Sequence, residues 1–453
     1  MLLPVPRALI LSALWAAFLA LVLVDWMVTF RVPSLLLWTL AALPLFLLTA
    51  LASLGEEAWR DRSRVRGPLI GWVAIVAGVA LLHALVPRVI VQGQVVRTVT
   101  AVSLIDVVVP FWIALRALAL AWGRRRLPFV LGIAVPLVMV AGYLVMIPMP
   151  GIAHEGPLPP ASPSQQRLAE RLRAHVEVLA GAIGERNSAR PAGLDSAAAY
   201  VGRELAASGL RVASHGYAVA GRRFRNLEVA IPGTSEPDRV LVVGAHYDSA
   251  PGSPGADDNA SATAALIELA RLLRADRPAF TIRLVAFTNE EPPFFQAPGM
   301  GSRVYASDAR RGARGDVVAM LSLETIGYFT DQPGSQRYPF PFNLFYPDRG
   351  DFIAFVGDLN SRGLVRSSVR VFRGATAFPA HGVAAPAFVP GVNWSDHGSF
   401  WLYGYPALMI TDTAPFRSHD YHTIGDSPEK LDYDRMARVV EGVAAVVRAL
   451  AAG

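Results

Sequence analysis

The chain of 453 residues is longer than one ordinary domain, and 53% of it is hydrophobic while only 17% is charged. Together with a mean hydropathy of +0.37, these proportions argue against an entirely soluble protein. Cysteine is absent, which excludes disulfide frameworks, thiolate metal sites, cysteine nucleophiles and iron–sulfur clusters. Any metal must therefore be held by His, Asp and Glu.

The net charge of +6 comes from one part of the chain. Residues 1–150 hold 12 Arg and 5 acidic residues, a net charge of +7, whereas the remainder holds 30 basic and 31 acidic residues, a net charge of −1. A basic excess confined to an apolar region is typical of membrane topology and not of a phosphate-binding face. We therefore expect no nucleic-acid partner.

Five apolar runs, each close to the ~20 residues that cross a bilayer, fill most of residues 1–150 and predict an all-α transmembrane region. They are residues 8–24, 33–54, 68–87, 99–122 and 129–148. No cleavage site follows the first run, so we interpret it as a membrane span and not as a signal peptide. The polar residues His83 and Asp106 lie within the third and fourth runs, where they either fix helix packing or serve a function.

The arginines between the runs predict the orientation, because cytoplasmic connections are rich in basic residues. The second connection carries four arginines and the fourth carries three, while the first and third carry one and two. The N-terminus is then inside, and everything after Pro148 lies outside. We expect a multi-pass protein of the bacterial inner (plasma) membrane, in contact with the lipid bilayer, whose soluble part is periplasmic or extracellular.

A Pro-rich stretch over residues 151–164 has no apolar periodicity and predicts a stiff linker. Residues 165–453 then alternate between helical and strand patterns, which indicates an α/β domain with a mixed, mainly parallel sheet flanked by helices. Strands are expected at residues 224–231, 240–246, 280–287, 317–323 and 407–411. Helices are expected at residues 165–183, 195–208, 260–274 and 433–450.

Acidic and His residues follow these strands, at the edge where such sheets bind ligands. His246 and Asp248 end one strand, and residues i and i+2 of a strand point to the same side. Adjacent carboxylates, Asp257 and Asp258, begin the next helix, where one of them alone would be an ordinary N-terminal cap.

Glu290 and Glu291 end the next strand, Glu324 ends the one after, and His422 lies in the loop after the last strand. Paired glutamates at a buried strand end are costly without a cation. Two imidazoles and three carboxylates, with one Glu to spare, match two divalent cations about 3.5 to 4 Å apart, and the imidazoles favour zinc.

The order of H-Y-D-S, P-G-A-D-D-N-A-S, N-E-E, L-E-T-I-G-Y and Y-H-T-x-x-D resembles the co-catalytic zinc aminopeptidases of metallopeptidase family twenty-eight, of the aminopeptidase Y and bacterial leucyl aminopeptidase type. The resemblance covers roughly residues 165–450 and implies a zinc-exopeptidase fold. It also implies an enzyme that uses two Zn²⁺ ions to remove N-terminal residues from peptides, and the apolar runs of residues 1–150 make this enzyme membrane-anchored.

By this resemblance, His246 and Glu324 hold one zinc ion, Glu291 and His422 hold the other, and Asp258 bridges them. Glu290 is then the general base and Asp248 supports His246. Many members have Asp where Glu324 stands, and the run Pro292–Phe295 differs from the small residues common there. The residues placed at the substrate pocket by the resemblance are Tyr328, Asp396 and His397.

Other interpretations are weaker. The adjacent residues Ser395, Asp396 and His397 cannot form a serine triad, since a triad needs groups that face one another. His419 is a less suitable ligand than His422, which has the Y-H-T context. The aromatic insertion at residues 330–350 is either a wall of the site or an ordinary packed loop.

Three other functions remain open. A glutaminyl cyclase shares the fold but generally lacks the Asp257–Asp258 doublet. A non-catalytic receptor or scaffold would not need every ligand and the base. A transporter would need more polar residues in its spans. Side-chain preference and oligomeric state are not readable from the sequence.

Overall fold

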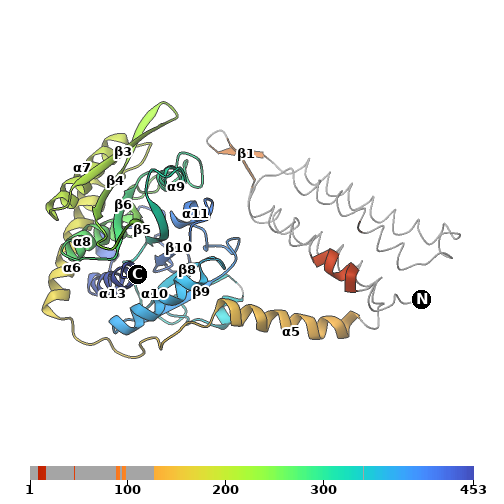
Figure 1. Ribbon diagram of the computed structural model, residues 1–453. Coiled ribbons are helices and arrows are strands. Elements are labelled where there is room, and N and C mark those ends of the chain that lie inside the picture. The colour runs from red at the N-terminus through yellow and green to blue at the C-terminus, as the bar shows by residue number, and fades with distance from the viewer. Residues whose placement is uncertain (1–8, 17–44, 46–87, 92–93, 98–126, 340) are drawn as a thin grey trace. The chain divides into compact units, whose positions relative to one another are not determined.

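The computed structural model describes residues 9–16, 45, 88–91, 94–97, 127–339 and 341–453. The chain divides into two compact units, residues 1–141 and residues 142–453. The boundary lies within helix α5 (Leu127–Met146), a few residues before the expected Pro-rich linker. The second unit contains the whole α/β domain and is described first (Figure 1).

An eight-stranded mixed sheet forms the centre of the domain, in the order β3-β4-β6-β5-β7-β10-β8-β9. Four of its neighbouring pairs are parallel and three are antiparallel, as the sequence predicts. The strands are β3 (Val212–Val219), β4 (Arg222–Ile231), β5 (Glu236–His246), β6 (Phe280–Phe287), β7 (Asp316–Glu324), β8 (Ile353–Gly357), β9 (Ala380–Ala384) and β10 (Ala407–Thr411).

Helices cover both faces of this sheet (Figure 1). Strand residues alternate between two buried clusters, because successive side chains of a strand point to opposite faces; Leu241 and Val243 belong to one cluster, Val240 and Val242 to the other. The larger cluster includes residues of α6 (Pro163–Val176), α7 (Pro191–Ala207), α8 (Ala262–Leu273), α10 (Arg362–Ala375) and α13 (Tyr433–Ala451). The second cluster includes α9 (Gly301–Arg310) and α11 (His397–Trp401).

Local sequence explains where the first helix of the domain begins. Ser162 caps α6 by accepting a hydrogen bond from the backbone N–H of Gln165, whose side chain accepts one from the backbone of Ser162. This reciprocal capping satisfies two N–H groups that the helix itself cannot bond. Beyond α6 the chain continues as a π-helix, Glu177–Ile183. The helix expected at residues 165–183 is therefore present, but its second part is π-helical and not α-helical.

Every other strand and helix expected in the domain is also present, and β6 and β10 have the expected bounds. The expectation omits several elements, most of them of ten residues or fewer. They are β3, β8, β9, α9, α10, α11 and α12 (Ala414–Arg417). Strands β8 and β9 have five residues each.

The N-terminal unit is described only in part. Residues 9–16 are helical, within the first expected membrane span, and α5 covers most of the fifth. Between the third and fourth expected spans, β1 (Arg88–Val91) pairs antiparallel with β2 (Gln94–Arg97). The expectation that this region is all-α is therefore wrong at the hairpin.

The third and fourth expected spans, with His83 and Asp106, lie outside the described residues, as does nearly all of the second. Within the part of the chain that is described, no helix combines the length and apolar character needed to cross a membrane.

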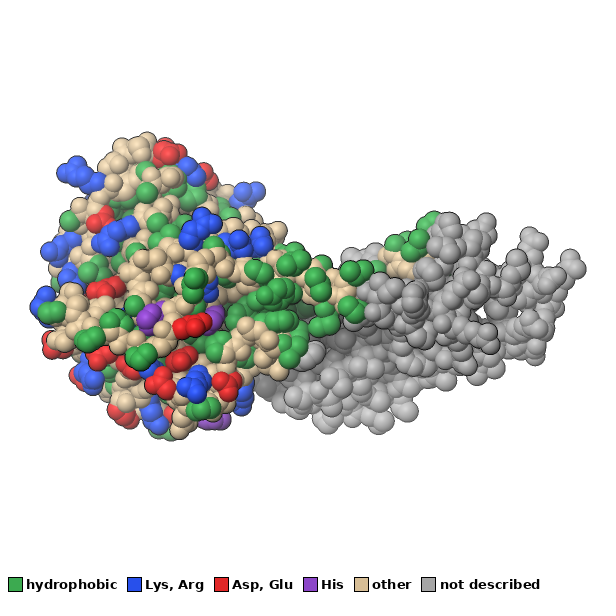
Figure 2. Space-filling view, turned by 90° about the horizontal axis from the view of Figure 1, so that it is seen from below, with side chains coloured by type: hydrophobic (Ala, Val, Ile, Leu, Met, Phe, Trp, Pro, Cys, Tyr) green, Lys and Arg blue, Asp and Glu red, His purple; other side chains and the backbone are tan. Residues whose placement is uncertain are grey.

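The surface of the α/β domain carries charges of both signs. Figure 2 shows basic and acidic side chains interspersed over the face of this domain, which agrees with the near-zero net charge of residues 151–453. Exposed apolar side chains occur where the chain enters the domain, at Tyr143, Leu144 and Val145, and at Phe345, whose ring contacts that of Tyr143.

Candidate metal centre

The carboxyl ends of β5, β6 and β7 meet at one edge of the sheet, because these three strands run parallel. Two groups of possible metal ligands form there, and within each group the ligand atoms lie within 4.8 Å of one another. One group is His246, Asp258 and Glu324, and the other is Asp258, Glu291 and His422. The structure thus brings together all five side chains that the sequence nominates as ligands.

Asp258 is common to both groups, and each of its oxygens faces a different histidine. Its Oδ1 lies 3.2 Å from Nε2 of His246, and its Oδ2 lies 2.9 Å from Nε2 of His422. Nε2 of His246 is 3.3 Å from Oε2 of Glu324, and Nε2 of His422 is 3.5 Å from Oε2 of Glu291. A carboxylate whose two oxygens face two ligand groups is suited to bridge two cations.

The donor atoms fit divalent cations. Nε2 of His246, Oδ1 of Asp258 and Oε1 of Glu291 are buried without a hydrogen-bond partner among the described residues. A buried polar atom without a partner costs free energy, and buried carboxylates cost more. Metal coordination would satisfy these atoms, and the nitrogen and oxygen donors match zinc more closely than magnesium or calcium.

Glu290 lies beside both groups without belonging to either. Its Oε2 is 3.9 Å from Nε2 of His246, and its side chain is buried. Asp248 fixes the backbone at this point, because its Oδ1 and Oδ2 accept the N–H groups of Glu290 (3.2 Å) and Glu291 (3.1 Å). Asp248 also contacts His246, with 3.5 Å between Oδ1 and Nδ1.

Like charges are crowded at this edge, and the pKa values respond accordingly. Burial, aided by neighbouring carboxylates, raises the pKa of Glu290 and of Glu291 well above the ordinary range. Burial also acts to raise the pKa of Asp258, but the two nearby imidazoles, His246 and His422, outweigh burial and lower it. The raised pKa values of the two glutamates are typical of a site where negative charges are crowded and buried.

The comparisons with known proteins agree with this geometry. The model of Peptidase family M28 matches residues 226–447. The uncharacterized protein YfbL of Escherichia coli is 39% identical over 312 residues, which cover 66% of this chain and 94% of that protein. The chain belongs to peptidase family M28.

More distant relatives include proteins named as zinc enzymes. A probable zinc metalloprotease of Leptosphaeria maculans is 30% identical over 248 residues, 48% of this chain and 55% of that protein, so the match spans about half of it. The zinc aminopeptidase BSAP from Bacillus subtilis has the same fold, with a TM-score of 0.50 and 15% identity over 62% of this chain and 95% of that one. LapB from Legionella pneumophila also has a TM-score of 0.50, with 19% identity over 67% and 79%.

Two buried residues of this M28 peptidase hold the metal-site loops. Arg186 donates to the carbonyl oxygens of Tyr247 (2.8 Å) and Gly255 (2.8 Å), which flank the loop before Asp258. Burial lowers its pKa to about 10, within the range where the guanidinium stays charged at neutral pH. Asp426 accepts the backbone N–H groups of Asp257 (2.8 Å) and Asp258 (3.1 Å), which connects the loop that carries His422 to the segment that carries Asp258.

Ser395 is a contributor that the sequence analysis missed. Its hydroxyl donates a hydrogen bond of 2.6 Å to Oε2 of Glu324, and it is also 3.0 Å from the hydroxyl of Ser322. Glu324 and Ser395 are 71 positions apart, and no local pattern connects them. The hydrogen bond holds the longer side chain of Glu324 in place.

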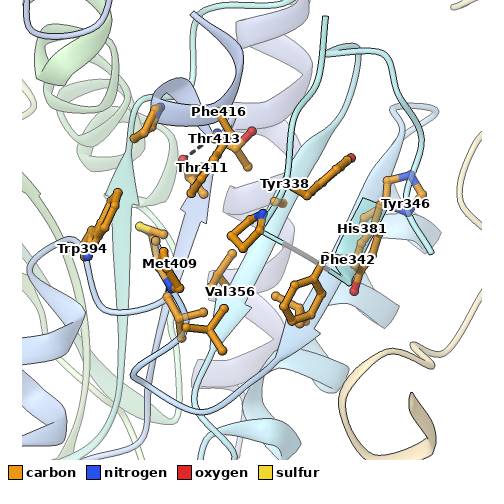
Figure 3. A pocket seen from close by; sticks show the side chains of 18 of the residues that line it. Tyr338, Phe342, Tyr346, Val356, His381, Trp394, Met409, Thr411, Thr413 and Phe416 are labelled. Atoms are coloured by element: carbon orange, nitrogen blue, oxygen red, sulfur yellow. Dashed lines mark hydrogen bonds between the residues drawn. The ribbon is translucent and has the colours of Figure 1, made fainter. Parts of the chain in front are cut away.

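An apolar pocket adjoins this metal centre. Glu324 and Tyr421 lie at its border, and its empty space amounts to about 840 Å³, part of which is open to solvent. The insertion at residues 330–350 supplies Tyr338, Phe342 and Tyr346 to its lining, so the insertion is a wall. Figure 3 shows Trp394 and Tyr346 on opposite sides, with Met409 and Val356 between them.

The residues expected at the substrate pocket do not line this pocket. His397 is buried, with Nε2 2.7 Å from the carbonyl oxygen of Val392. Asp396 is fully buried near the metal centre, and burial raises its pKa to about 7. Tyr328 packs against the larger core cluster, and its backbone N–H donates to Asp412 (2.8 Å). Contact of these three residues with a substrate stays a prediction.

Proposed function

We propose that this chain is a zinc aminopeptidase that binds two Zn²⁺ ions, one through His246 and Glu324 and the other through Glu291 and His422, with Asp258 shared. The observation that carries the proposal is the position of the two oxygens of Asp258, each within 3.2 Å of a different histidine. The zinc enzymes among the relatives, and the fold shared with a zinc aminopeptidase, support it.

When bound, the metal ions supply a Lewis acid that polarises a scissile carbonyl and lowers the pKa of an attacking water. The protein must then supply a base and later an acid. Glu290 is suited to both roles, because its carboxylate is not needed as a ligand and lies 3.9 Å from Nε2 of His246. Its carboxylate removes a proton from the water, and the resulting carboxylic acid donates that proton to the leaving amine.

Asp248 positions this base. It accepts hydrogen bonds from the backbone N–H groups of both Glu290 and Glu291, which fixes the backbone that carries the two side chains. The side chain of Glu291 is then available as a ligand, and that of Glu290 is available as the base. A base must lie within hydrogen-bond reach of the proton that it takes, and a fixed backbone keeps it there.

The experiment uses the full chain loaded with zinc and a panel of fluorogenic aminoacyl amides with free and with blocked N-termini, beside Glu290→Gln. We expect cleavage of the free substrates only. The variant should lose about 10²- to 10⁴-fold in kcat, which is the usual contribution of a general base, and should keep two metal ions per chain.

Three results would contradict the proposal. Cleavage of blocked substrates would show that a free N-terminus is not required. Full activity of Glu290→Gln would show that Glu290 is not the general base. Release of ammonia from an N-terminal glutamine, without peptide cleavage, would indicate a cyclase.

We further propose that residues 1–150 anchor the enzyme in a bacterial inner membrane, with the peptidase domain periplasmic or extracellular. The support is the sequence alone: five apolar runs and the arginines of alternate connections. Protease treatment of intact spheroplasts tests this orientation, since only an outward domain would be digested.

A further inference from the structure

The floor of the apolar pocket is a row of residues in register across four strands. Glu324 of β7 pairs with Thr411 of β10, Thr411 pairs with Ala354 of β8, and Ala354 pairs with His381 of β9. Directly paired residues point to the same face of a sheet. The row therefore begins at a metal ligand and ends at a histidine on the same face.

A second row, two residues along each strand, completes this floor with Met409, Val356 and Val383. Three strand spacings of ~4.8 Å separate Glu324 from His381, which places their Cα atoms about 14 Å apart. A leucine side chain bound beside the metal centre is too short to cross this floor. A six-membered ring with a substituent at its far end is long enough to approach His381.

Aromatic rings form the walls above the floor. Tyr338 and Phe342 both stack on Tyr346, with ring centroids 5.8 and 6.4 Å apart, and Trp394 stacks on Phe416 at 6.1 Å with an angle of 11° between the ring planes. Flat walls of this kind favour a flat apolar group through offset and edge contacts between rings.

His381 is a polar side chain at the far end of the floor. The two tyrosine hydroxyls nearest to it in the aromatic wall are engaged: that of Tyr346 donates to the carbonyl oxygen of Gly382 (2.7 Å), and that of Tyr338 donates to the carbonyl oxygen of Pro347 (2.6 Å). Neither ring nitrogen of His381 has a hydrogen-bond partner within the described residues, although its ring contacts Tyr346 and Phe352 edge to face.

Burial, with a smaller effect of Arg373, lowers the pKa of His381 to about 4, so its imidazole is neutral at pH 7. A neutral imidazole has one nitrogen that accepts a hydrogen bond. A ligand that leaves this nitrogen unpaired loses the hydrogen bond that water would have made.

We propose that this pocket binds the side chain of an N-terminal tyrosine of the substrate, and that His381 accepts a hydrogen bond from the tyrosine hydroxyl. The inference rests on the proposed aminopeptidase function and names its substrate class. His381 is then a residue that determines specificity, distant from the metal ligands and unnecessary for the hydrolytic step itself.

The test compares substrates that differ only at the ring. The full chain, loaded with zinc, is assayed with the fluorogenic amides of tyrosine, phenylalanine, O-methyltyrosine and leucine. We expect kcat/KM for tyrosine to exceed that for phenylalanine by about tenfold, the effect of one hydrogen bond. O-Methyltyrosine, which cannot donate, should fall below tyrosine to a similar extent, and leucine should be the poorest of the four.

The variant His381→Phe keeps a ring in the same place and should bring the ratio of tyrosine to phenylalanine close to one, without lowering kcat/KM for phenylalanine. The matched control His154→Phe changes a histidine outside the pocket and should keep the wild-type ratio. The substrate series with the wild-type chain gives an answer even if His381→Phe does not fold.

Two outcomes overturn the inference and are distinguishable. If the chain cleaves substrates with a free N-terminus but prefers leucine, or has equal kcat/KM for tyrosine and phenylalanine, it is an aminopeptidase without this specificity. A chain that binds two zinc ions and cleaves no free N-terminal substrate contradicts the proposed function, and the inference is lost with it.

Discussion

The residues on the two sides of Glu324 lie along one edge of the sheet, but one side is charged and the other is apolar. Toward β5 and β6 lie His246, Glu290 and Glu291, buried and crowded with charge. Toward β10, β8 and β9 lie Thr411, Ala354 and His381, and there the surroundings are apolar. Glu324 is the last charged residue of the first side and borders the second.

This difference separates two tasks. On the charged side, each residue offsets or adds to a charge that its neighbours leave uncompensated. A single substitution there should therefore have a large effect on activity and should alter the metal content. On the apolar side, residues contribute contact area and one hydrogen bond to the substrate. A single substitution there should therefore have a small effect on activity and should leave the metal content unchanged. Substitutions on each side test this division, from the largest expected effect to the smallest.

Asp258→Asn should have the largest effect. An amide cannot offer two anionic oxygens, so both ligand groups lose their shared member and activity should fall to that of a blank without enzyme. Metal content, measured by mass spectrometry after gel filtration, should fall with it. Asp257→Asn is the matched control, because Asp257 accepts the N–H of Gly327 (2.9 Å) and an amide oxygen can do the same. Two retained metal ions in Asp258→Asn would refute the bridging role.

Ser395→Ala should have an intermediate effect. It removes the hydrogen bond of 2.6 Å to Glu324, and loss of a group that orients a ligand typically lowers metal affinity by about 10- to 100-fold. Competition with a chromophoric chelator measures this affinity. Ser322→Ala, which removes only a contact to Ser395, should change it much less. Equal affinities in both variants would mean that the serine does not hold Glu324.

Trp394→Ala tests the apolar side. Its side chain is 38% exposed and stacks on Phe416, so the fold should tolerate its loss. The stacking surface for a substrate ring is reduced, and KM for aromatic amides should rise by about three- to tenfold, the usual value of one aromatic contact. Metal content and kcat should be unchanged. A loss of metal in this variant would show that the two sides are not independent.

The smallest effect concerns stability against pH. The pKa of His381 is lowered from 6.5 to about 4 in the folded protein, so between these values the unfolded chain binds a proton that the folded chain does not. The contribution of His381 to the free energy of unfolding is therefore greatest above about pH 6.5, and it falls as the pH decreases toward 4.

Urea midpoints at pH 7.5 and pH 5 for the wild type, His381→Phe and His154→Phe measure this contribution. We expect His381→Phe to lose less stability than the other two chains on acidification, because it lacks the histidine that takes up a proton only when the chain unfolds. The histidines of the candidate metal centre are present in all three chains and contribute equally. An identical loss in all three chains would show that His381 is not held neutral by burial.

Most of the charged side could be predicted from the sequence, for a physical reason. Each ligand follows or ends a buried strand, and strands that alternate with helices run parallel, so their carboxyl ends meet at one edge. His246, Asp258 and Glu291 could therefore be nominated together, because each one ends a strand or lies in the loop or helix start that follows it. The same regularity makes the apolar β5, β6, β7 and β10 recognisable as strands.

The apolar side could not be predicted in this way. Strands β8 and β9 are short and reach the edge with their amino ends, because β8 runs antiparallel to β10. No motif marks Ala354 or His381, and the sequence analysis instead placed Tyr328 and His397 at the substrate pocket. The contact between Ser395 and Glu324 also has no signal in the local sequence.

The sequence by itself indicated the class of chemistry, since the candidate metal ligands and the candidate base end or follow its strands and it has no cysteine to compete with them. Only the tertiary structure decided which oxygen of Asp258 faces which histidine and which side chains surround the substrate. The reason is that strand-end motifs are local patterns of a few residues, whereas a pocket floor is a row across strands, set by a register that no single segment contains.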